Sequence, residues 1–208
     1  GCGIGTDTIN FARSGARVVA VDISPVSIKI CKIRAEIYHK DIQFICADAE
    51  SFIPELKAKF DLIYAFGCIH HTPDPVTVLI QLRKYLKPDG ILKIMIYNLF
   101  SWKVLCILIR YAKLNVFALK KAIAKHSEAQ IGCPTTHVFT RHRVKNLLKQ
   151  LGYQIISISI EHIFPYKIRQ YTQYKYVKTW YFRWMPEKLF KWLENILGWH
   201  ICITAKLK

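Results

Sequence analysis

Short apolar runs recur through the first half of the chain, separated by segments with helical character. Residues 17–23, 42–47, 60–66 and 91–97 are rich in Val, Ile, Leu and Phe, as strands buried in a parallel sheet are. Ser24-Pro25 and Asp74-Pro75 each place a capping residue before a proline, which predicts helices from Pro25 to about Tyr38 and from Pro75 to Leu86. Strands that alternate with helices predict a doubly wound α/β fold.

The pattern changes after position 98. Residues 99–125 are predicted to be helical, with their cations on one side if the helix is continuous. Thr140 can cap a helix that ends at Gly152. Residues 153–163 and 199–207 are predicted strands, and a helix that starts at Pro186 and ends before Gly198 precedes the second of them. We expect one domain over 1–208, with insertions at about 99–135 and 165–198.

Composition narrows the class of protein. The chain has 208 residues, of which 52% are hydrophobic and 22% charged, so a globular domain is expected rather than a disordered segment. No uncharged apolar run approaches the roughly 18 residues of a membrane span. The seven cysteines are scattered without a C-x-x-C pair, which indicates a reducing, cytoplasmic location. The histidines and cysteines show no zinc-ligand spacing, so no metal site is expected.

The positive charge is concentrated in the second half of the chain. Residues 1–98 hold 12 Lys and Arg against 10 Asp and Glu, whereas residues 99–208 hold 19 against 4. Aromatic residues divide in the same way, 9 before position 99 and 18 after it. This distribution indicates either a solvated basic surface or a surface for an anionic partner.

A glycine-rich segment opens the chain. Gly1-Cys2-Gly3-Ile4-Gly5 precedes a predicted helix, and an acidic residue, Asp22, ends the next predicted strand. Glycines let backbone N–H groups approach a ligand, and a carboxylate at the end of the strand that follows the glycine-rich segment can bind ribose hydroxyls. NAD sites share both features. However, Thr6 occupies the position where the dinucleotide fingerprint requires Gly or Ala.

The ordered set of motifs resembles the class I S-adenosylmethionine (SAM) methyltransferases, in particular the subgroup of the ubiquinone and menaquinone C-methyltransferases. The resemblance covers 1–98 and is carried by G-C-G-I-G-T, V-V-A-V-D-I-S, F-I-C-A-D-A, F-D-L-I-Y-A-F-G-C-I-H-H-T-P-D-P and L-K-P-D-G-I-L. It implies a Rossmann-like seven-stranded sheet whose last strand, 199–207, is antiparallel and lies beside 153–163. The strand that precedes the glycine segment in the family is missing here, so the first central strand is expected to be absent.

The resemblance also implies roles for particular residues. Gly1, Gly3 and Gly5 correspond to the loop under the methionine and ribose of SAM. The ribose and adenine contacts correspond to Asp22, Ile23, Asp48 and Ala49, and the residues that line the methyl end correspond to Phe66 and Gly67.

Methyl transfer needs alignment of donor and acceptor more than it needs particular side chains. A general base assists when the acceptor is a hydroxyl or an acidic carbon, and histidine is the usual base near neutral pH. His70 and His71 follow the third apolar run of the chain, and His137 leads into the helix capped by Thr140. We expect one of these three histidines to serve the acceptor, the alternative being that they hydrogen-bond the loops.

The composition of the 165–198 insertion indicates which kinds of acceptor the protein could methylate. Residues 164–192 contain 11 aromatic side chains, interleaved with Lys and Arg and with one acid, Glu187. This mixture suits docking on an anionic membrane, stacking on single-stranded RNA, or a plain lid over SAM and a small substrate. The Asn/Asp-Pro-Pro-aromatic motif of amino-methylating nucleic-acid enzymes is absent after the third run. The expected function is therefore methylation of a small-molecule or lipid-linked acceptor, with a peripheral membrane location as one option. An RNA methyltransferase and a non-catalytic SAM-binding protein are the alternatives.

Overall fold

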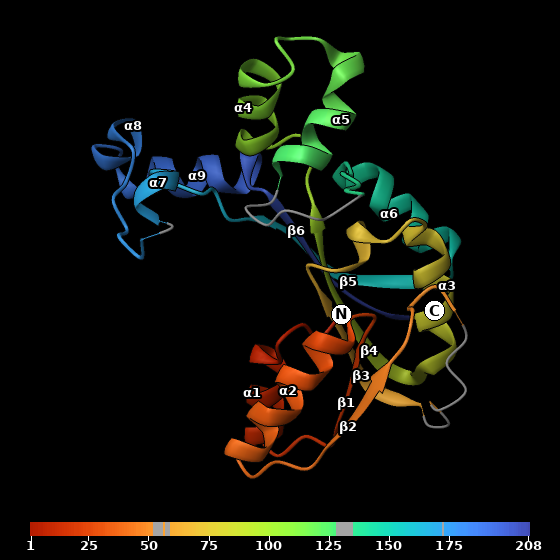
Figure 1. Cartoon of the computed structure of the whole chain (residues 1–208). Helices are drawn as coiled ribbons and strands as arrows, with labels where there is room; N and C mark the ends of the chain where they lie inside the picture. Colours follow the sequence, from red (N-terminus) through yellow and green to blue (C-terminus); the bar gives the residue numbers. More distant parts are fainter. Residues whose placement is uncertain (52–55, 57–58, 128–134, 172) are drawn as a thin grey trace.

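The computed structural model describes residues 1–51, 56, 59–127, 135–171 and 173–208 (Figure 1). Its strands form two groups. Strands β1 (Val18–Asp22) and β2 (Ile42–Cys46) pair in parallel, while the second group has the order β3-β4-β6-β5. In that group β3 (Phe60–Phe66) is parallel to β4 (Leu86–Tyr97), and β6 (His200–Leu207) is antiparallel to both β4 and β5 (Tyr153–Glu161).

This topology confirms the Rossmann-like α/β fold with an antiparallel last strand. Among the described strands, none pairs with the free edges of β1 and β3. In the described residues the two groups of strands are therefore separate sheets. The exposed side chains of Leu62 and Tyr64 on β3 agree with an unpaired edge.

The helices of the first half begin where the capping residues predict. α1 spans Thr6–Arg13, α2 spans Pro25–Ile37 and α3 spans Pro75–Tyr85. The Ser24 hydroxyl accepts a hydrogen bond from the Ser27 N–H at 3.2 Å, and the Asp74 carboxylate accepts one from the Val76 N–H at 3.0 Å. A short 3₁₀ turn, η1 (Ile69–His71), follows β3.

Two predicted boundaries are wrong. Leu86 begins β4 instead of ending α3, and the strand starts before residue 91 and includes Asp89 and Gly90, although an Asp-Gly pair favours a turn. The pairing of β4 with β3 is irregular there, because Phe60 pairs with Leu86 and Leu62 with Ile91. The fully buried Leu86 side chain packs in the core, so tertiary packing outweighs the local turn signal.

The segment after position 98 is helical, as predicted, but it is not one continuous helix. It forms two helices, α4 (Trp102–Arg110) and α5 (Val116–His126), which project together from the sheet (Figure 1). The chain turns between them because Lys113 and Leu114 adopt left-handed backbone angles, with φ of 48° and 63°. The condition for one row of cations is therefore not met, and the cations are divided between two helices and the turn that joins them. The end of this insertion, 128–134, lies outside the described residues.

The remaining helices follow the predicted order. α6 (Arg141–Gln150) is capped by the Thr140 hydroxyl, which accepts a hydrogen bond from the Arg143 N–H at 3.1 Å. Between β5 and β6 the chain forms α7 (Ile168–Tyr171), α8 (Trp180–Arg183) and α9 (Glu187–Leu197). In the described part of the chain, no helix has the length and apolar character to cross a membrane.

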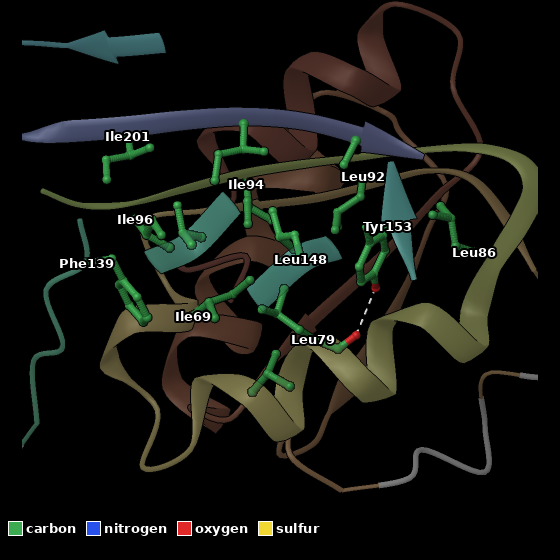
Figure 2. Packing of buried hydrophobic residues seen from close by; sticks show 14 residues of the cluster. Ile69, Leu79, Leu86, Leu92, Ile94, Ile96, Phe139, Leu148, Tyr153 and Ile201 are labelled. Atoms are coloured by element: carbon green, nitrogen blue, oxygen red, sulfur yellow. Dashed lines mark hydrogen bonds between the residues drawn. The ribbon is translucent and has the colours of Figure 1, made fainter. Parts of the chain in front are cut away.

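The largest core cluster lies between the β3-β4-β6-β5 sheet and helices α3 and α6 (Figure 2). Strand residues such as Leu92 and Ile201 meet Leu79 of α3 and Leu148 of α6 there. The Tyr153 hydroxyl donates a hydrogen bond to the Leu79 carbonyl at 2.8 Å inside this core (Figure 2). A second cluster covers the other face, where Met95 and Tyr97 pack against α4 and α5. These two clusters fix the carboxyl ends of β3 and β4, which carry the candidate site.

Candidate functional site

The glycine segment forms a tight loop before α1. Gly3 and Gly5 have positive φ angles of 53° and 86°, and the Gly5 N–H donates a hydrogen bond to the Cys2 carbonyl at 3.0 Å. The Cys2 N–H donates to the Val21 carbonyl at 2.9 Å, which fastens the loop to the end of β1. A Cβ atom on Gly5 would lie 2.2 Å from Cys31 Sγ, so both conformation and space require glycine there. The N-terminus of α1 begins directly after this loop, where backbone N–H groups favour an anionic or polar ligand.

Asp22 connects this loop to the following turn. Its buried carboxylate accepts hydrogen bonds from the Gly3 N–H at 2.8 Å and from the Ser24 N–H at 2.9 Å. A carboxylate offers about four lone-pair sites, so two remain for further donors. Asp22 therefore sets the loop conformation and keeps the capacity to bind hydroxyl groups.

The next predicted contacts lie beside Asp22 because β1 and β2 pair. The Ala47 N–H donates to the Asp22 carbonyl at 3.0 Å, which brings the segment after β2 next to the end of β1. Asp48 follows and is exposed, while Ala49 is partly buried. Ile23, the predicted adenine contact, also exposes its side chain. An acidic side chain and an apolar one are thus exposed at neighbouring strand ends, and the Asp48 carboxylate accepts one hydrogen bond, from the Glu50 N–H at 2.9 Å.

The loop also meets the end of β3. A Cβ atom on Gly1 would lie 2.4 Å from Cys68 Cβ, so the glycine loop and the segment after β3 are in close contact. Gly67 has a φ of 78°, and its N–H donates to the Met95 carbonyl at 3.3 Å. The Phe66 side chain is exposed at this point. The predicted methyl-end residues therefore adjoin the predicted cofactor loop.

The three candidate histidines form one cluster. The ring centroids of His70 and His71 are 4.2 Å apart, and the His137 N–H donates to the His70 carbonyl at 2.8 Å. His71 Nδ1 lies 3.2 Å from the Thr135 carbonyl oxygen. His137 Nε2 is buried and has no hydrogen-bond partner among the described residues. The fold thus brings together positions that are more than sixty residues apart in the sequence.

His70 differs from the other two in its burial. Its ring is fully buried, 3.7 Å from the Tyr97 ring between centroids, and neither ring nitrogen has a hydrogen-bond partner in the described part of the chain. Burial lowers the pKa of His70 to about 2, and the nearby His71 and His200 act in the same direction. A histidine this weakly basic holds a proton poorly, so the geometry favours His71 or His137 over His70 as a base.

Sequence reasoning missed a second pair of histidines at the same sheet edge. His162 directly follows β5 and His200 begins β6, and their rings stack with centroids 4.8 Å apart. The His200 ring also lies 6.1 Å from the Phe66 ring. The pKa of His200 is lowered to about 4, mainly by burial and also by the nearby His162 and Lys103. The sequence contained a signal for His200: the last strand is antiparallel, so its first residue lies at the edge where the parallel strands end.

The two basic segments that the sequence predicted as insertions leave the sheet at this edge. The first follows Tyr97 at the end of β4 and the second joins β5 to β6, whose first residue, His200, is the register partner of Tyr97. They contact one another, since the Trp102 ring lies 5.9 Å from the Tyr181 ring. The second insertion carries an apolar hollow lined by Trp180, Tyr181, Trp184, Met185, Pro186 and Leu189. In the residues that the structure describes, no group of three His, Cys, Asp or Glu side chains could hold a metal ion.

Known proteins match the part of the chain that carries this site. Residues 1–94 match the family described as "Methyltransferase domain". The ubiquinone biosynthesis O-methyltransferase of Rhodopseudomonas palustris (strain HaA2) is 33% identical over 103 residues, which are 50% of this chain and 40% of that protein. The protein of the same name from Bradyrhizobium sp. (strain ORS 278) is 34% identical over 103 residues, with the same shares. The match spans about two fifths of the length of these relatives.

Solved structures match the fold over the whole chain. Magnesium protoporphyrin IX methyltransferase from Synechocystis PCC 6803 with bound SAH has a TM-score of 0.63 and 14% identity, covering 100% of this chain and 72% of that one. The [4+2]-cyclase SpnF has a TM-score of 0.65 and 15% identity, with the same coverage. A 1,6-didemethyltoxoflavin-N1-methyltransferase from Burkholderia thailandensis, with SAH bound, has a TM-score of 0.58 and 18% identity, covering 100% and 68%. These likenesses establish the fold.

Proposed function

We propose that the chain is part of a class I SAM-dependent methyltransferase, with S-adenosyl-L-methionine as cofactor, and that the protein methylates a small-molecule or lipid-linked acceptor. The observation that carries the proposal is the buried Asp22 carboxylate bound to the Gly3 N–H at 2.8 Å. This bond holds together the two elements that contact the cofactor in the proposed site. The names of the relatives, ubiquinone biosynthesis O-methyltransferases, support a small acceptor that carries a hydroxyl group.

The described residues fit this cofactor. Gly1, Gly3 and Gly5 would leave room for its methionine and ribose, and Asp22 has lone pairs left for two ribose hydroxyls. Adenine would lie by Ile23, Asp48 and Ala49, with Phe66 and Gly67 at the methyl end. When bound, SAM supplies an electrophilic methyl group on a sulfonium.

The remaining work of the protein is to hold the acceptor and to take its proton. His71 and His137 lie beside His70 and Tyr97, at the edge where the acceptor would enter. His200 lies beside Phe66 at the same edge, but burial lowers its pKa to about 4, so it would line the entrance and not take the proton. A neutral imidazole there can accept the proton of an acceptor hydroxyl and pass it to water. His70 would instead keep the cluster packed, because its burial opposes a charged form.

We also propose that the 165–198 insertion docks on an anionic membrane surface. Leu189, Trp192 and Ile196 are exposed at i, i+3 and i+7 positions of α9, and Lys188 and Lys191 flank them. None of the residues of α9 is buried, and Leu189 of this stripe also lines the apolar hollow formed with Trp180 and Trp184. An amphipathic helix of this kind suits the interface between lipid and water. The alternative is a plain lid over the substrate.

The direct test uses the full-length protein with methyl-labelled SAM. Cell extracts, including their lipid fraction, would be incubated with the protein and analysed by mass spectrometry. We expect label in one small or lipid-linked product. Label in RNA would favour the RNA methyltransferase. Absence of labelled product, with SAM binding confirmed by calorimetry, would favour a non-catalytic SAM-binding protein and contradict the proposal.

Docking is tested separately by sedimentation with vesicles at one ionic strength. We expect binding to anionic vesicles that is lost when Lys175, Lys178 and Arg183 are changed to Glu. Indifference to vesicles would leave the insertion as a substrate lid.

A further inference from the structure

The turn between α4 and α5 is a well-built structure that exposes apolar side chains. We call residues 113–117 the α4–α5 tip. The Leu114 N–H donates to the Leu108 carbonyl at 3.0 Å, and the Asn115 N–H donates to the Ala112 carbonyl at 2.8 Å. The Asn115 side chain caps α5 by accepting from the Phe117 N–H at 2.9 Å. These bonds fix the conformation of the tip, even though Lys113 and Leu114 have left-handed backbone angles.

The side chains of the tip point away from the protein. Leu114, Val116 and Phe117 are 68%, 64% and 94% exposed. The inward faces of α4 and α5 are already packed, because Ile107 and Ile123 are buried against the sheet. The exposed side chains of the tip are therefore not needed to pack these helices against the sheet. A contiguous exposed apolar surface of this kind is typical of an interaction site.

The surroundings of the tip are uniformly basic. Residues 99–127 contain no Asp or Glu, and their cations are Lys103, Arg110, Lys113, Lys120, Lys121 and Lys125. An anionic partner is therefore favoured by charge. Aliphatic side chains such as Leu114 and Val116 can neither stack on bases nor hydrogen-bond them, whereas they gain free energy in hydrocarbon. The combination fits an anionic lipid surface better than a nucleic acid.

We propose that the α4–α5 tip inserts into the headgroup region of an anionic membrane. The tip belongs to the insertion that follows β4, and the aromatic insertion between β5 and β6 leaves the same edge of the sheet. Trp102 at the start of α4 joins the two, with its ring 6.1 Å from that of Phe182. Docking through both insertions would turn the edge that carries Phe66 toward the lipid. Its use in catalysis rests on the proposed function, but the binding itself does not depend on methyl transfer.

The test measures sedimentation of the full chain with phosphatidylcholine vesicles, with and without phosphatidylglycerol. The variant Leu114→Ala/Phe117→Ala should lower partitioning into anionic vesicles by about tenfold or more. The matched control is Val26→Ala/Ile37→Ala, which removes two side chains that are each 66% exposed on α2, at the other end of the molecule (Figure 1). This control should bind as the unmodified protein does.

A second pair of variants tests the charge. Lys120→Glu/Lys121→Glu should weaken binding to anionic vesicles, whereas Lys29→Glu/Lys40→Glu, with the same net charge, should not. Circular dichroism and thermal melting would verify that every variant is folded. Equal vesicle binding by the tip variants and their controls would overturn the proposal.

Two other binding partners of the tip, single-stranded RNA and a second copy of the chain, would give different results. Binding of single-stranded RNA that is lost in the tip variants, without vesicle binding, would assign the tip to nucleic acid. Self-association that is lost in these variants, measured by sedimentation velocity, would assign it to a second copy of the chain. Either result contradicts lipid docking. Methyl transfer is measured in a separate experiment with methyl-labelled SAM. If vesicle binding depends on the tip but no methyl group is transferred, the proposed function is refuted and lipid docking by the tip is not.

Discussion

The side-chain carboxylate of Asp22 accepts a hydrogen bond from the backbone N–H of Gly3 at 2.8 Å. These residues are nineteen positions apart, and the bond joins the glycine loop to the end of β1. The second carboxylate oxygen accepts from the Ser24 N–H at 2.9 Å, so one buried anion organises both sides of the proposed cofactor site. Several measurable consequences follow from this arrangement and from the packing around it.

Replacement of Asp22 by Ala should weaken SAM binding by about tenfold to a hundredfold. The reason is the loss of charge-assisted hydrogen bonds worth about 1.5–3 kcal/mol, to the ribose and to the loop. Calorimetry on the full-length protein would measure the change. Asp41→Ala is the control, because Asp41 is an exposed carboxylate just before β2. Equal SAM affinity in the two variants would remove Asp22 from the site.

Gly5→Ala should destabilise the protein more than Gly15→Ala. Both glycines have nearly the same backbone angle, φ of 86° and 89°, so the conformational cost of a Cβ atom, about 1–2 kcal/mol, is shared. At Gly15 the Cβ atom meets nothing within 4 Å, whereas at Gly5 it lies 2.2 Å from Cys31 Sγ. We expect an excess loss of about 1–3 kcal/mol for Gly5→Ala, measured by urea unfolding. Adding Cys31→Ala should recover part of that excess, and no recovery would show that the clash is not its cause.

His70 should make the protein less stable in mild acid. Its pKa is about 2 in the folded protein, against 6.5 ordinarily, so below pH 6.5 the unfolded chain binds a proton that the folded protein does not. Unfolding is then favoured as the pH falls, by about 2 kcal/mol between pH 7 and pH 5. His70→Phe should flatten this dependence in urea titrations at the two pH values. His142→Gln, which removes an exposed histidine, should leave it unchanged.

One of His71 and His137 should be needed for turnover but not for cofactor affinity, whereas His200, a weaker base because it is buried, should not be needed. Each would be replaced by Ala, and labelled-methyl transfer would be measured on the identified acceptor beside SAM binding by calorimetry. A base that acts on the acceptor contributes about a hundredfold to ten-thousandfold in rate. Full turnover in all three variants would show that the reaction proceeds without a histidine base from this set.

Tyr153→Phe should cost about 0.5–1.5 kcal/mol of stability. The fully buried hydroxyl donates to the Leu79 carbonyl at 2.8 Å and ties β5 to α3 across the main core. Chemical unfolding would measure the loss. Tyr174→Phe is the control, because its side chain is exposed, and an equal effect of the two changes would argue against the buried bond as the cause.

The local chemistry of the chain was sufficient for much of the fold. Ser24 and Asp74 with their following prolines predicted helix starts that the structure confirms, because a cap depends on a few adjacent backbone groups. The apolar runs predicted the strands, although only the carboxyl half of β4 is buried on both faces and β3 exposes Leu62 and Tyr64. The glycine segment and Asp22 likewise stood out in the sequence, because their geometry needs particular residue types.

Tertiary structure decided the features that depend on distant partners. Leu86 begins a strand that runs through Asp89-Gly90, against the local preference of that pair for a turn, because its side chain fills the core. Left-handed backbone angles at Lys113 and Leu114 separate α4 from α5, although the apolar pattern of the sequence shows no interruption there. The burial that makes His70 a poor base arises from Tyr97 and other residues far along the chain. The His162–His200 pair exists because β5 and β6 end and begin at one edge. Local sequence specifies backbone hydrogen bonds and caps, whereas burial and the meeting of side chains are set by which strands become neighbours.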